Sequence, residues 1–321
     1  MPEFQITAAE SGRTILEALQ SRLKLPSSKI ARIIQEGRVT LAGSLCASPS
    51  WRVKRGQKLE LQSRDLPKHK ESKAEPVIRY VDVHVIVVEK PAGLTTVRHP
   101  GEAAEFGNRG KRFLPATLAD LLPALLAQKV KGKPGSVWAV HRLDRDTSGL
   151  VVFARTKEAE RHLGNQFRAK STDRHYLAIV RGRAKDGRIE SFLVDDRGDG
   201  RRGSTNVSGK GKRAVTDVKL IESLGEHSLV ECRLETGRTH QVRIHLGESG
   251  TPICGERIYD RPVHGKPLPD KSGAKRLALH AASLGFEHPA SGKAMGWNSP
   301  LPADLTKLLV QLRHQQNSSP I

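Results

Sequence analysis

Two aspartates stand among two arginines in the segment HRLDRDTSGL, residues 141–150. Asp144 follows Arg142 by two positions, and a run of apolar residues comes directly after the segment. A carboxylate close to arginines stays ionised and is well suited to nucleophilic attack. We predict a loop over 142–149 that leads into a buried strand over 150–154, with Asp144 as the candidate catalytic group. Taken alone, the residue types favour a second interpretation, a structural salt-bridge cluster.

A second segment, LETGRTHQVRIHL over 234–246, carries basic side chains among apolar ones. Its alternation predicts a strand over 239–246 with Arg243 and His245 on one face. From such a strand Arg243 could reach a carboxylate at another strand end, and a solvated arginine on the sheet surface is the alternative. His240 and His245 are five positions apart, which fits neither spacing of common metal-binding pairs. We therefore predict no metal site.

The third segment, TDRHYLAIV over 172–180, places Tyr176 at the start of an apolar strand. A single tyrosine in such a strand is usually a core residue. A tyrosine that faces a cleft could instead stack on a pyrimidine and donate or accept a proton. The residues alone leave both roles open.

Length and charge limit the class of protein. The chain has 321 residues, which predicts about two domains. Its net charge of +20 indicates a polyanionic partner, because contacts with phosphates release counterions. Nucleic acid fits best, and an anionic membrane surface is the alternative. The cysteines, Cys46, Cys232 and Cys254, show no paired spacing and indicate reduced thiols in a cytoplasmic protein. We expect neither a signal peptide nor a membrane span.

Residues 1–61 have the pattern of a separate small domain. Two helices and two strands are predicted in it, over 15–23, from Pro26 to 36, over 38–41 and over 58–61. Ser11 is the expected N-cap of the first helix, Gly37 the C′ glycine of the second, and Ala42-Gly43 a turn. This pattern resembles the S-four-like RNA-binding domain, named for a small-subunit ribosomal protein. Basic side chains on its polar faces are predicted to contact RNA, with a merely solvated face as the alternative: Arg13, Lys29, Arg32 and Arg38.

The rest of the chain divides into a linker, a second domain and a tail. The polar residues 62–75 predict the linker, 76–312 the domain and 313–321 the tail. Strands are expected over 85–88, 215–221 and 228–234, and a helix that Thr117 caps and Pro123 would disturb. The Gly- and Arg-rich segment 195–213 predicts a long hairpin loop, which either orders on RNA or has no role.

Together the three segments resemble the RluA-type pseudouridine synthases. The matching motifs are HRLDRDTSGL (141–150), RHYLAIVRG (174–182) and TGRTHQVRIHL (236–246). The resemblance covers most of residues 78–305, and an N-terminal S-four-like domain is common among relatives that act on large-subunit ribosomal RNA. Two positions depart from the family pattern: Glu256, where Asp is frequent, and Asp260, where Gly is frequent.

The resemblance implies an α+β fold. A small α/β S-four-like domain would precede a pseudouridine synthase catalytic domain, built on a mixed, mainly antiparallel β-sheet flanked by helices and loops. The implied reaction isomerises uridine to pseudouridine without a redox change, so we expect no cofactor. The target base must be flipped out of its stack.

The resemblance also assigns roles within the site. Asp144 matches the catalytic aspartate, Tyr176 the tyrosine that packs on the target uracil, and Arg243 the arginine that pairs with the aspartate. Arg142 matches a position that contacts or replaces the flipped nucleotide. The side chains expected to bind substrate are His141, Arg142, Thr147, Arg238 and His240.

Two other classes of protein compete with this one. A non-catalytic RNA-binding or ribosome-assembly factor would have lost Asp144, Tyr176 or Arg243, and all three are present. A metal-dependent nuclease needs a carboxylate cluster that holds a cation, which arginines around Asp144 and Asp146 disfavour. We expect a cytoplasmic monomer without membrane contact. Its expected substrate is large-subunit ribosomal RNA or an assembly intermediate of it, with transfer and messenger RNA as alternatives.

Overall fold

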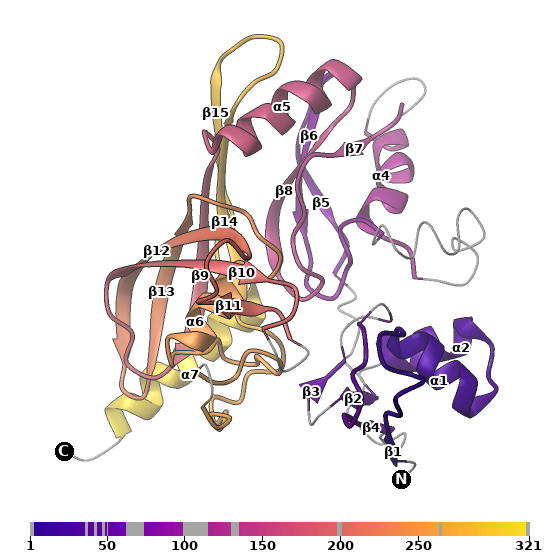
Figure 1. Ribbon diagram of the computed structural model, residues 1–321. Coiled ribbons are helices and arrows are strands. Elements are labelled where there is room, and N and C mark those ends of the chain that lie inside the picture. The colour runs from indigo at the N-terminus through magenta and orange to yellow at the C-terminus, as the bar shows by residue number, and fades with distance from the viewer. Residues whose placement is uncertain are drawn as a thin grey trace. The chain divides into compact units, whose positions relative to one another are not determined.

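Two compact units make up the chain, shown as a computed structural model in Figure 1. The first holds residues 1–70 with two later segments, 98–116 and 194–203, and the second holds the remainder. The structure describes residues 3–35, 38–41, 44–46, 49, 51–61, 74–98, 115–129, 135–197, 201–262 and 265–318. Several predicted features lie outside or almost wholly outside these ranges: Gly37, the turn at Ala42-Gly43 and the linker at 62–75.

Helices and an antiparallel sheet form the first unit. Its elements are β1 (Glu3–Gln5), α1 (Ile15–Leu23), α2 (Ser27–Gln35), β2 (Val39–Leu41), β3 (Ser44–Leu45) and β4 (Lys58–Leu61). The strands pair in the order β1-β4-β2-β3. Apolar residues of both helices, such as Ile15 and Ile34, pack in one buried cluster with Leu59 of the sheet. The helices and strands predicted for this segment are therefore present.

The N-cap of the first helix is Thr14, three residues after the predicted one. The Thr14 hydroxyl accepts a hydrogen bond from the Glu17 amide at 3.2 Å, and the Glu17 carboxylate accepts one from the Thr14 amide at 2.7 Å. This reciprocal pair satisfies two amides that have no partner within the helix. The Ser11 hydroxyl accepts instead from the Arg55 amide. The prediction of Ser11 as N-cap is therefore wrong.

A large mixed sheet organises the second unit. Its strands are β5 (Val77–Val81), β6 (Val85–Lys90), β7 (Trp138–Ala139), β8 (Ser148–Ala154), β9 (Asp173–Arg181), β10 (Gly187–Val194), β11 (Gly203–Thr205), β12 (Lys212–Leu224), β13 (His227–Leu234), β14 (Leu279–Glu287) and β15 (Ala294–Asn298). They follow the order β11-β10-β12-β13-β9-β14-β8-β6-β5, with β15 beside β14 and β7 beside β8. β14 and β8 run parallel, and the pairs on either side of them are antiparallel. The predicted mixed, mainly antiparallel sheet is confirmed.

Helices cover both faces of the sheet around β6 and β8. Alternate residues such as Val88 and Val151 pack in one cluster with Leu122 of α4 (Leu118–Ala127). Their neighbours, such as Val87 and Val152, pack in another cluster with Leu163 of α5 (Lys157–Ala169). Burial on both faces explains why residues 85–88 of β6 and 150–154 of β8 are all apolar. The loop that carries Asp144 leads directly into β8, so a fully buried strand anchors it.

The predicted strand over 239–246 is wrong, because this segment forms the helix α6 (Gln241–Glu248). The helix starts after His240, whose φ is 59°, and all of residues 241–247 are buried. Buried polar side chains, which find partners inside the protein, interrupt the apolar residues and imitate the alternation of a strand. Gly247 lies against Tyr259, where a Cβ would come within 2.2 Å of the carbonyl oxygen.

The last helix is longer than the sequence suggested. α7 runs from Ala303 to Ser318, so residues 313–318 of the predicted tail are helical. Leu308 and Leu312 pack in the core, and the Arg313 guanidinium pairs with Glu222 at 2.6 Å. The predicted strands over 85–88, 215–221 and 228–234 lie within β6, β12 and β13. Thr117 caps α4 as predicted, but the helix continues through Pro123. The segment 195–213 is not a loop throughout, because it contains the short strand β11 and its last two residues belong to β12, which pairs with β10.

Candidate active site

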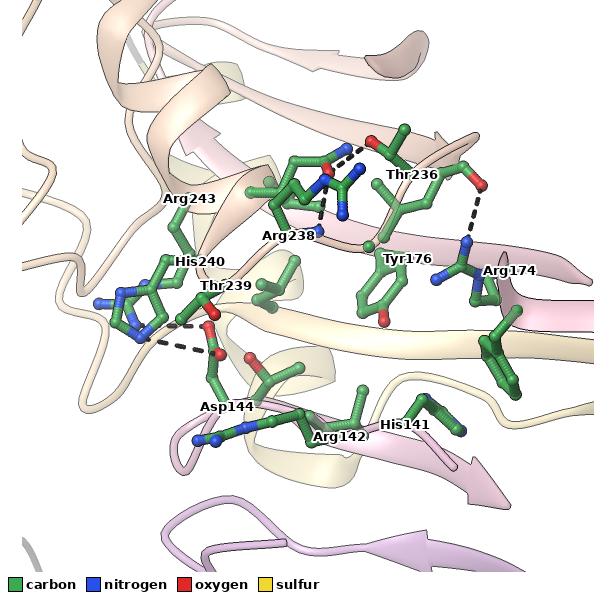
Figure 2. A pocket seen from close by; sticks show the side chains of 18 of the residues that line it. His141, Arg142, Asp144, Arg174, Tyr176, Thr236, Arg238, Thr239, His240 and Arg243 are labelled. Atoms are coloured by element: carbon green, nitrogen blue, oxygen red, sulfur yellow. Dashed lines mark hydrogen bonds and ion pairs between the residues drawn. The ribbon is translucent and has the colours of Figure 1, made fainter. Parts of the chain in front are cut away.

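A cavity of about 480 Å³ lies in the second unit (Figure 2). The loop before β8, the start of β9 with the end of α5, and the segment from β13 to α6 supply its walls. Eight predicted side chains line it: His141, Arg142, Asp144, Thr147, Tyr176, Arg238, His240 and Arg243. The structure therefore brings every predicted catalytic and substrate-binding side chain to the same cavity, whose volume suits a ligand of nucleotide size.

Backbone contacts hold the loop that carries Asp144. The Thr96 hydroxyl donates to the Leu143 carbonyl at 2.8 Å and accepts from the Leu143 amide at 3.2 Å. On the other side of Asp144, the buried Lys90 ammonium donates to the Arg145 carbonyl at 3.0 Å. Both neighbours of the aspartate are thus fixed to the segment that follows β6. The direction of the Asp144 side chain follows from these contacts.

The Asp144 carboxylate faces both Arg243 and His240 (Figure 2). Arg243 Nη1 is 3.5 Å from Oδ2, and His240 Nε2 is 3.8 Å from Oδ1. Burial alone would raise the pKa of Asp144, but His240, Arg243 and Arg142 together hold this pKa below its usual value. With 18% of its side chain exposed, Asp144 remains an ionised carboxylate that a ligand in the cavity can reach.

Glu256 holds Arg243 from the opposite side. Arg243 Nε and Nη2 donate to the two carboxylate oxygens of Glu256 at 2.7 and 2.9 Å. The Glu256 carboxylate also accepts from the amides of Arg257 and Ile258. Burial would raise the pKa of Glu256, yet Arg243 and the amides of Ile258 and Tyr259 lower it to about 2. The guanidinium is therefore permanently charged and fixed in its plane, because the contact is bidentate.

His240 is held by Tyr259, three residues after Glu256. Its Nδ1 lies 2.8 Å from the Tyr259 hydroxyl, so that Nε2 faces Asp144. Its left-handed backbone conformation, with a φ of 59°, is uncommon for a residue other than glycine. This conformation turns the chain from the TGRTH segment into α6 and brings His240 and Arg243 to the same carboxylate.

Tyr176 lies on the central strand β9, between β13 and β14. It is 8% exposed, and its ring lines the cavity. Burial raises the pKa of Tyr176 to about 12, because it outweighs the opposite effect of Arg174, and Asp144 raises the pKa further. The phenol is therefore neutral at physiological pH. A partly apolar ring at this position can pack against a flat base.

His141 forms part of the cavity wall and is held there by contacts within the protein. Its Nε2 accepts a hydrogen bond from the Val152 amide at 3.1 Å, and its ring stacks on Phe167 at 4.4 Å. Burial lowers the pKa of His141 to about 3. The ring is neutral and its Nε2 is already used by the backbone of β8. This leaves its face rather than that nitrogen for contact with a ligand.

The other side chains predicted to bind substrate differ in their exposure and in the hydrogen bonds that they already make. Arg142 is exposed at the cavity. Arg238 Nε donates to the Arg213 carbonyl at 3.0 Å, which holds its side chain along β12. The Thr147 hydroxyl is buried and has no hydrogen-bond partner among the described residues. Arg142 and Thr147 thus keep hydrogen-bonding capacity for a ligand.

The predicted RNA-binding residues belong to the first unit. Arg13, Lys29 and Arg32 are exposed, and Arg38 is half-buried. Arg13 precedes α1, Lys29 and Arg32 lie on α2, and Arg38 directly precedes β2. Their basic groups therefore lie at the surface of this unit.

Sequence reasoning missed four residues of the site: Lys90, Thr96, Arg174 and Glu256. Lys90 ends an apolar strand in EKPAG, where a lysine is expected in solvent, and it is 1% exposed. Glu256 was noticed only as a departure from the family pattern. Arg174 lies two positions before Tyr176 in a strand, so the alternation of side chains could have placed it in the cavity.

Within the described ranges, no group of three or more His, Cys, Asp or Glu side chains is arranged to hold a metal ion. A search of the same residues finds no helix with the length and apolar character needed to cross a bilayer.

The fold and the site define the class of protein. The structure of human RNA Pseudouridylate Synthase Domain Containing 4 superposes with a TM-score of 0.58 at 25% identity, covering 74% of this chain and 92% of that one. Residues 84–248 match the family described as RNA pseudouridylate synthase.

Relatives match over nearly the whole chain. Ribosomal large subunit pseudouridine synthase D of Zymomonas mobilis is 36% identical over 97% of this chain and 98% of its own length. Ribosomal large subunit pseudouridine synthase C of Escherichia coli is 32% identical over 96% of both. The chain belongs to the RNA pseudouridylate synthase family, whose members isomerise uridine to pseudouridine, and the resemblance seen in the sequence is confirmed.

Proposed function

We propose that this enzyme modifies uridines of large-subunit ribosomal RNA, with Asp144 as its catalytic carboxylate. The names of the Zymomonas mobilis and Escherichia coli relatives support this substrate. One observation supports the role of Asp144 above others: an ionised carboxylate, held by Arg243 and His240, faces a cavity that also contains Tyr176. The reaction needs such a group next to the ribose and the base.

The isomerisation breaks the bond between N1 of uracil and C1′ of ribose and forms a bond between C5 and C1′. The C5 proton leaves, and N1 takes up a proton, so the sum of atoms and electrons is unchanged. Asp144 acts on the ribose or on the base in the step that separates them. Arg243 keeps the carboxylate ionised and oriented, and Glu256 keeps Arg243 in place.

The detached uracil must stay in the cavity while it turns. Tyr176 packs on the base, and its hydroxyl assists the loss of the C5 proton. Flipping the uridine out of its stack costs a few kcal/mol, which favourable phosphate contacts of this strongly basic protein offset. Arg142, exposed at the cavity, contacts the flipped nucleotide or fills the space it leaves.

The first unit supplies further RNA contacts as an S-four-like domain. Two short helices on a small sheet, with exposed basic side chains, support this role. We divide the chain into this domain at 1–61, a linker at 62–75, the catalytic domain at 76–312 and a tail. The enzyme acts in the cytoplasm as a monomer, on ribosomal RNA or on an assembling particle.

Tritium release from ribosomal RNA labelled at C5 of uridine tests the function. Wild type, Asp144→Ala and Asp144→Asn are compared in the presence of a chelator, and RNA binding is measured in parallel. We expect release by the wild type alone and similar RNA affinity for all three proteins. Full release by Asp144→Asn would refute the assignment of Asp144.

The choice of RNA separates the remaining alternatives. Large-subunit, small-subunit and transfer RNA are offered separately, and we expect release from the first. Release from another RNA alone would refute the proposed substrate. Tight binding without release from any of them would favour a docking factor, and strand cleavage that stops with chelator would favour a metal-dependent nuclease.

A further inference from the structure

Arg174 is a buried cation in the wall of the cavity. It is 6% exposed, and it lies two residues before Tyr176 on β9, so both side chains point to the same side of the strand. In the view of Figure 2, Tyr176 lies between Arg174 and Asp144. Arg174 therefore faces the space next to the ring that would pack on the base.

The hydrogen-bonding capacity of Arg174 is largely unused. Nη2 donates one long hydrogen bond, 3.4 Å, to the Leu234 carbonyl. Nε is buried without a partner among the described residues. The guanidinium lies 5.4 Å from the centre of the Phe167 ring, and within the described residues no carboxylate is in ion-pair distance. A guanidinium has five N–H donors and stays protonated in proteins.

A buried charge without a counterion is costly for a folded protein. The neighbouring backbone nevertheless leaves room for the Arg174 guanidinium. Gly237 lies against the guanidinium, and a Cβ at this position would come within 2.7 Å of Arg174 Nη1. Asp144 is the one acidic side chain among the described residues that line the cavity, and Arg243 and His240 already contact it. The missing counterion is therefore expected in the ligand.

We propose that Arg174 binds a phosphate of the RNA backbone next to the flipped uridine. This inference rests on the proposed function, because it takes RNA as the ligand of the cavity. Uracil carbonyls and ribose oxygens are the other acceptors within the substrate, but they are neutral and would leave the buried charge uncompensated. A phosphodiester supplies both a full negative charge and oxygen acceptors for Nε and the two terminal nitrogens. Arg168 and Lys170, which also line the cavity, add to the attraction of the backbone.

The dependence of RNA binding on salt tests this contact. Binding of a short oligouridylate is measured in the Asp144→Asn background, which removes turnover, between about 50 and 200 mM potassium chloride. Arg174→Gln should weaken binding by about 10- to 100-fold. The plot of log affinity against log salt should become less steep by about 0.7, the value for one phosphate of a single strand. Arg174→Lys should keep most of the slope.

Matched variants control for charge and for space. Arg183→Gln removes the same charge from an exposed site beyond the far end of β9, where Arg183 pairs with Glu226, and it should leave the slope unchanged. Gly237→Ala should weaken binding by displacing the guanidinium. It should have no further effect when Arg174 is already Gln, because the two changes remove the same contact.

The stability of the free protein distinguishes a role of Arg174 in ligand binding from a role in the fold. If the arginine serves the ligand, the melting temperature of the free Arg174→Gln protein should equal or exceed that of the parent, because an uncompensated charge is removed. An unchanged slope would refute the phosphate contact. A slower single turnover at saturating RNA with unchanged affinity, measured for Arg174→Gln in the enzyme that keeps Asp144, would also refute it. Should Arg174→Gln fail to fold, Gly237→Ala with unaltered affinity would refute it equally.

A separate measurement tests the proposed function. Tritium release by the unmodified enzyme reports on turnover, whereas the salt slope reports on the phosphate contact. If Arg174→Gln shows the expected loss of slope but the wild type releases no tritium, the phosphate site is supported and the proposed function is refuted. Tritium release by the wild type with no loss of slope in Arg174→Gln would support the proposed function and refute the phosphate site.

Discussion

The guanidinium of Arg243 lies closer to Glu256 than to Asp144. It donates to both oxygens of Glu256, at 2.7 and 2.9 Å, whereas its nearest approach to the Asp144 carboxylate is 3.5 Å. The bidentate contact fixes the plane of the guanidinium. Glu256 therefore determines the direction from which Arg243 meets the proposed catalytic carboxylate, and the looser contact leaves Asp144 free to approach a substrate.

Glu256→Gln should reduce both stability and turnover. Loss of one partner of a buried ion pair costs roughly 3–5 kcal/mol, because the other charge stays buried. The pKa of Glu256 is lowered from its ordinary 4.5 to about 2. Its stabilising effect is therefore present above about pH 4.5 and is lost as the pH falls towards 2. Urea unfolding at pH 7 and at lower pH measures the first effect, and tritium release measures the second.

Glu256→Asp is the matched control for this change. It keeps the charge on a side chain that is one methylene shorter, and aspartate is the residue that the family pattern often has at this position. We expect this variant to lie between the wild type and Glu256→Gln in both measurements. Wild-type stability and rate in Glu256→Gln would show that Arg243 is held by other contacts.

Removal of Arg243 should move the acidic limb of the pH–rate profile upwards. Burial raises the pKa of Asp144, and His240 and Arg243 reverse this effect in the folded protein. In Arg243→Gln the burial effect is opposed less, so Asp144 takes up a proton at higher pH and activity is lost earlier as the pH falls. Single-turnover rates from about pH 3 to 8, a range that includes the ordinary pKa of an aspartate, measure the shift, which is worth about 1.4 kcal/mol per pH unit.

Arg142→Gln serves as the comparison for that profile. Arg142 also lowers the pKa of Asp144, but it is exposed and acts less than Arg243. Its removal should shift the limb in the same direction by a smaller amount. Coincident acidic limbs in the wild type and Arg243→Gln would mean that another group controls the rate at low pH.

The sequence allowed prediction of most elements whose residues alternate or repeat at helical spacing. Most residues of β6 and β8 are apolar because helices bury both faces of these strands, and the positions of the strands follow from composition alone. α6 was missed for a physical reason. Gln241, Arg243 and His245 are buried and paired inside the protein, so their polarity does not mark a solvent face. A pattern of polar and apolar residues cannot distinguish a polar residue in water from one with a buried partner.

The site could be predicted where a motif carries the residues, and less so where distant segments meet. Asp144, Tyr176 and Arg243 lie in recognisable segments, and the structure brings them to one cavity. Lys90 and Glu256 act through contacts with groups that lie far away in the sequence or on the backbone. Their burial and their partners exist only in the fold, and the sequence pattern therefore gave them no functional weight.

Gly149→Ala should destabilise the protein by roughly 3 kcal/mol or more. Gly149 is the second residue of β8, close to the loop of Asp144, with a φ of 114°, and a Cβ would lie 2.2 Å from the Ala281 carbonyl oxygen. The parallel pairing of β8 with β14 would have to open to admit a methyl group. Urea unfolding provides the measurement, with Gly187→Ala as control. At Gly187 no atom lies within 4 Å of the added Cβ, so a loss of similar size there would contradict the steric explanation.

Tyr176→Phe separates the ring of this residue from its hydroxyl. The ring should still pack on the base, so RNA affinity should be kept, whereas Tyr176→Ala should lose about 1–3 kcal/mol of stacking. Without the hydroxyl, release of the C5 proton should slow by ~100-fold.

Burial raises the pKa of the Tyr176 phenol to about 12, so its ionised fraction grows about tenfold per pH unit below that value. Tritium release by the wild type should therefore rise between about pH 7 and 9, and this rise should be absent in Tyr176→Phe. A phenylalanine variant as fast as the wild type, with a flat profile in both, would limit Tyr176 to packing on the base.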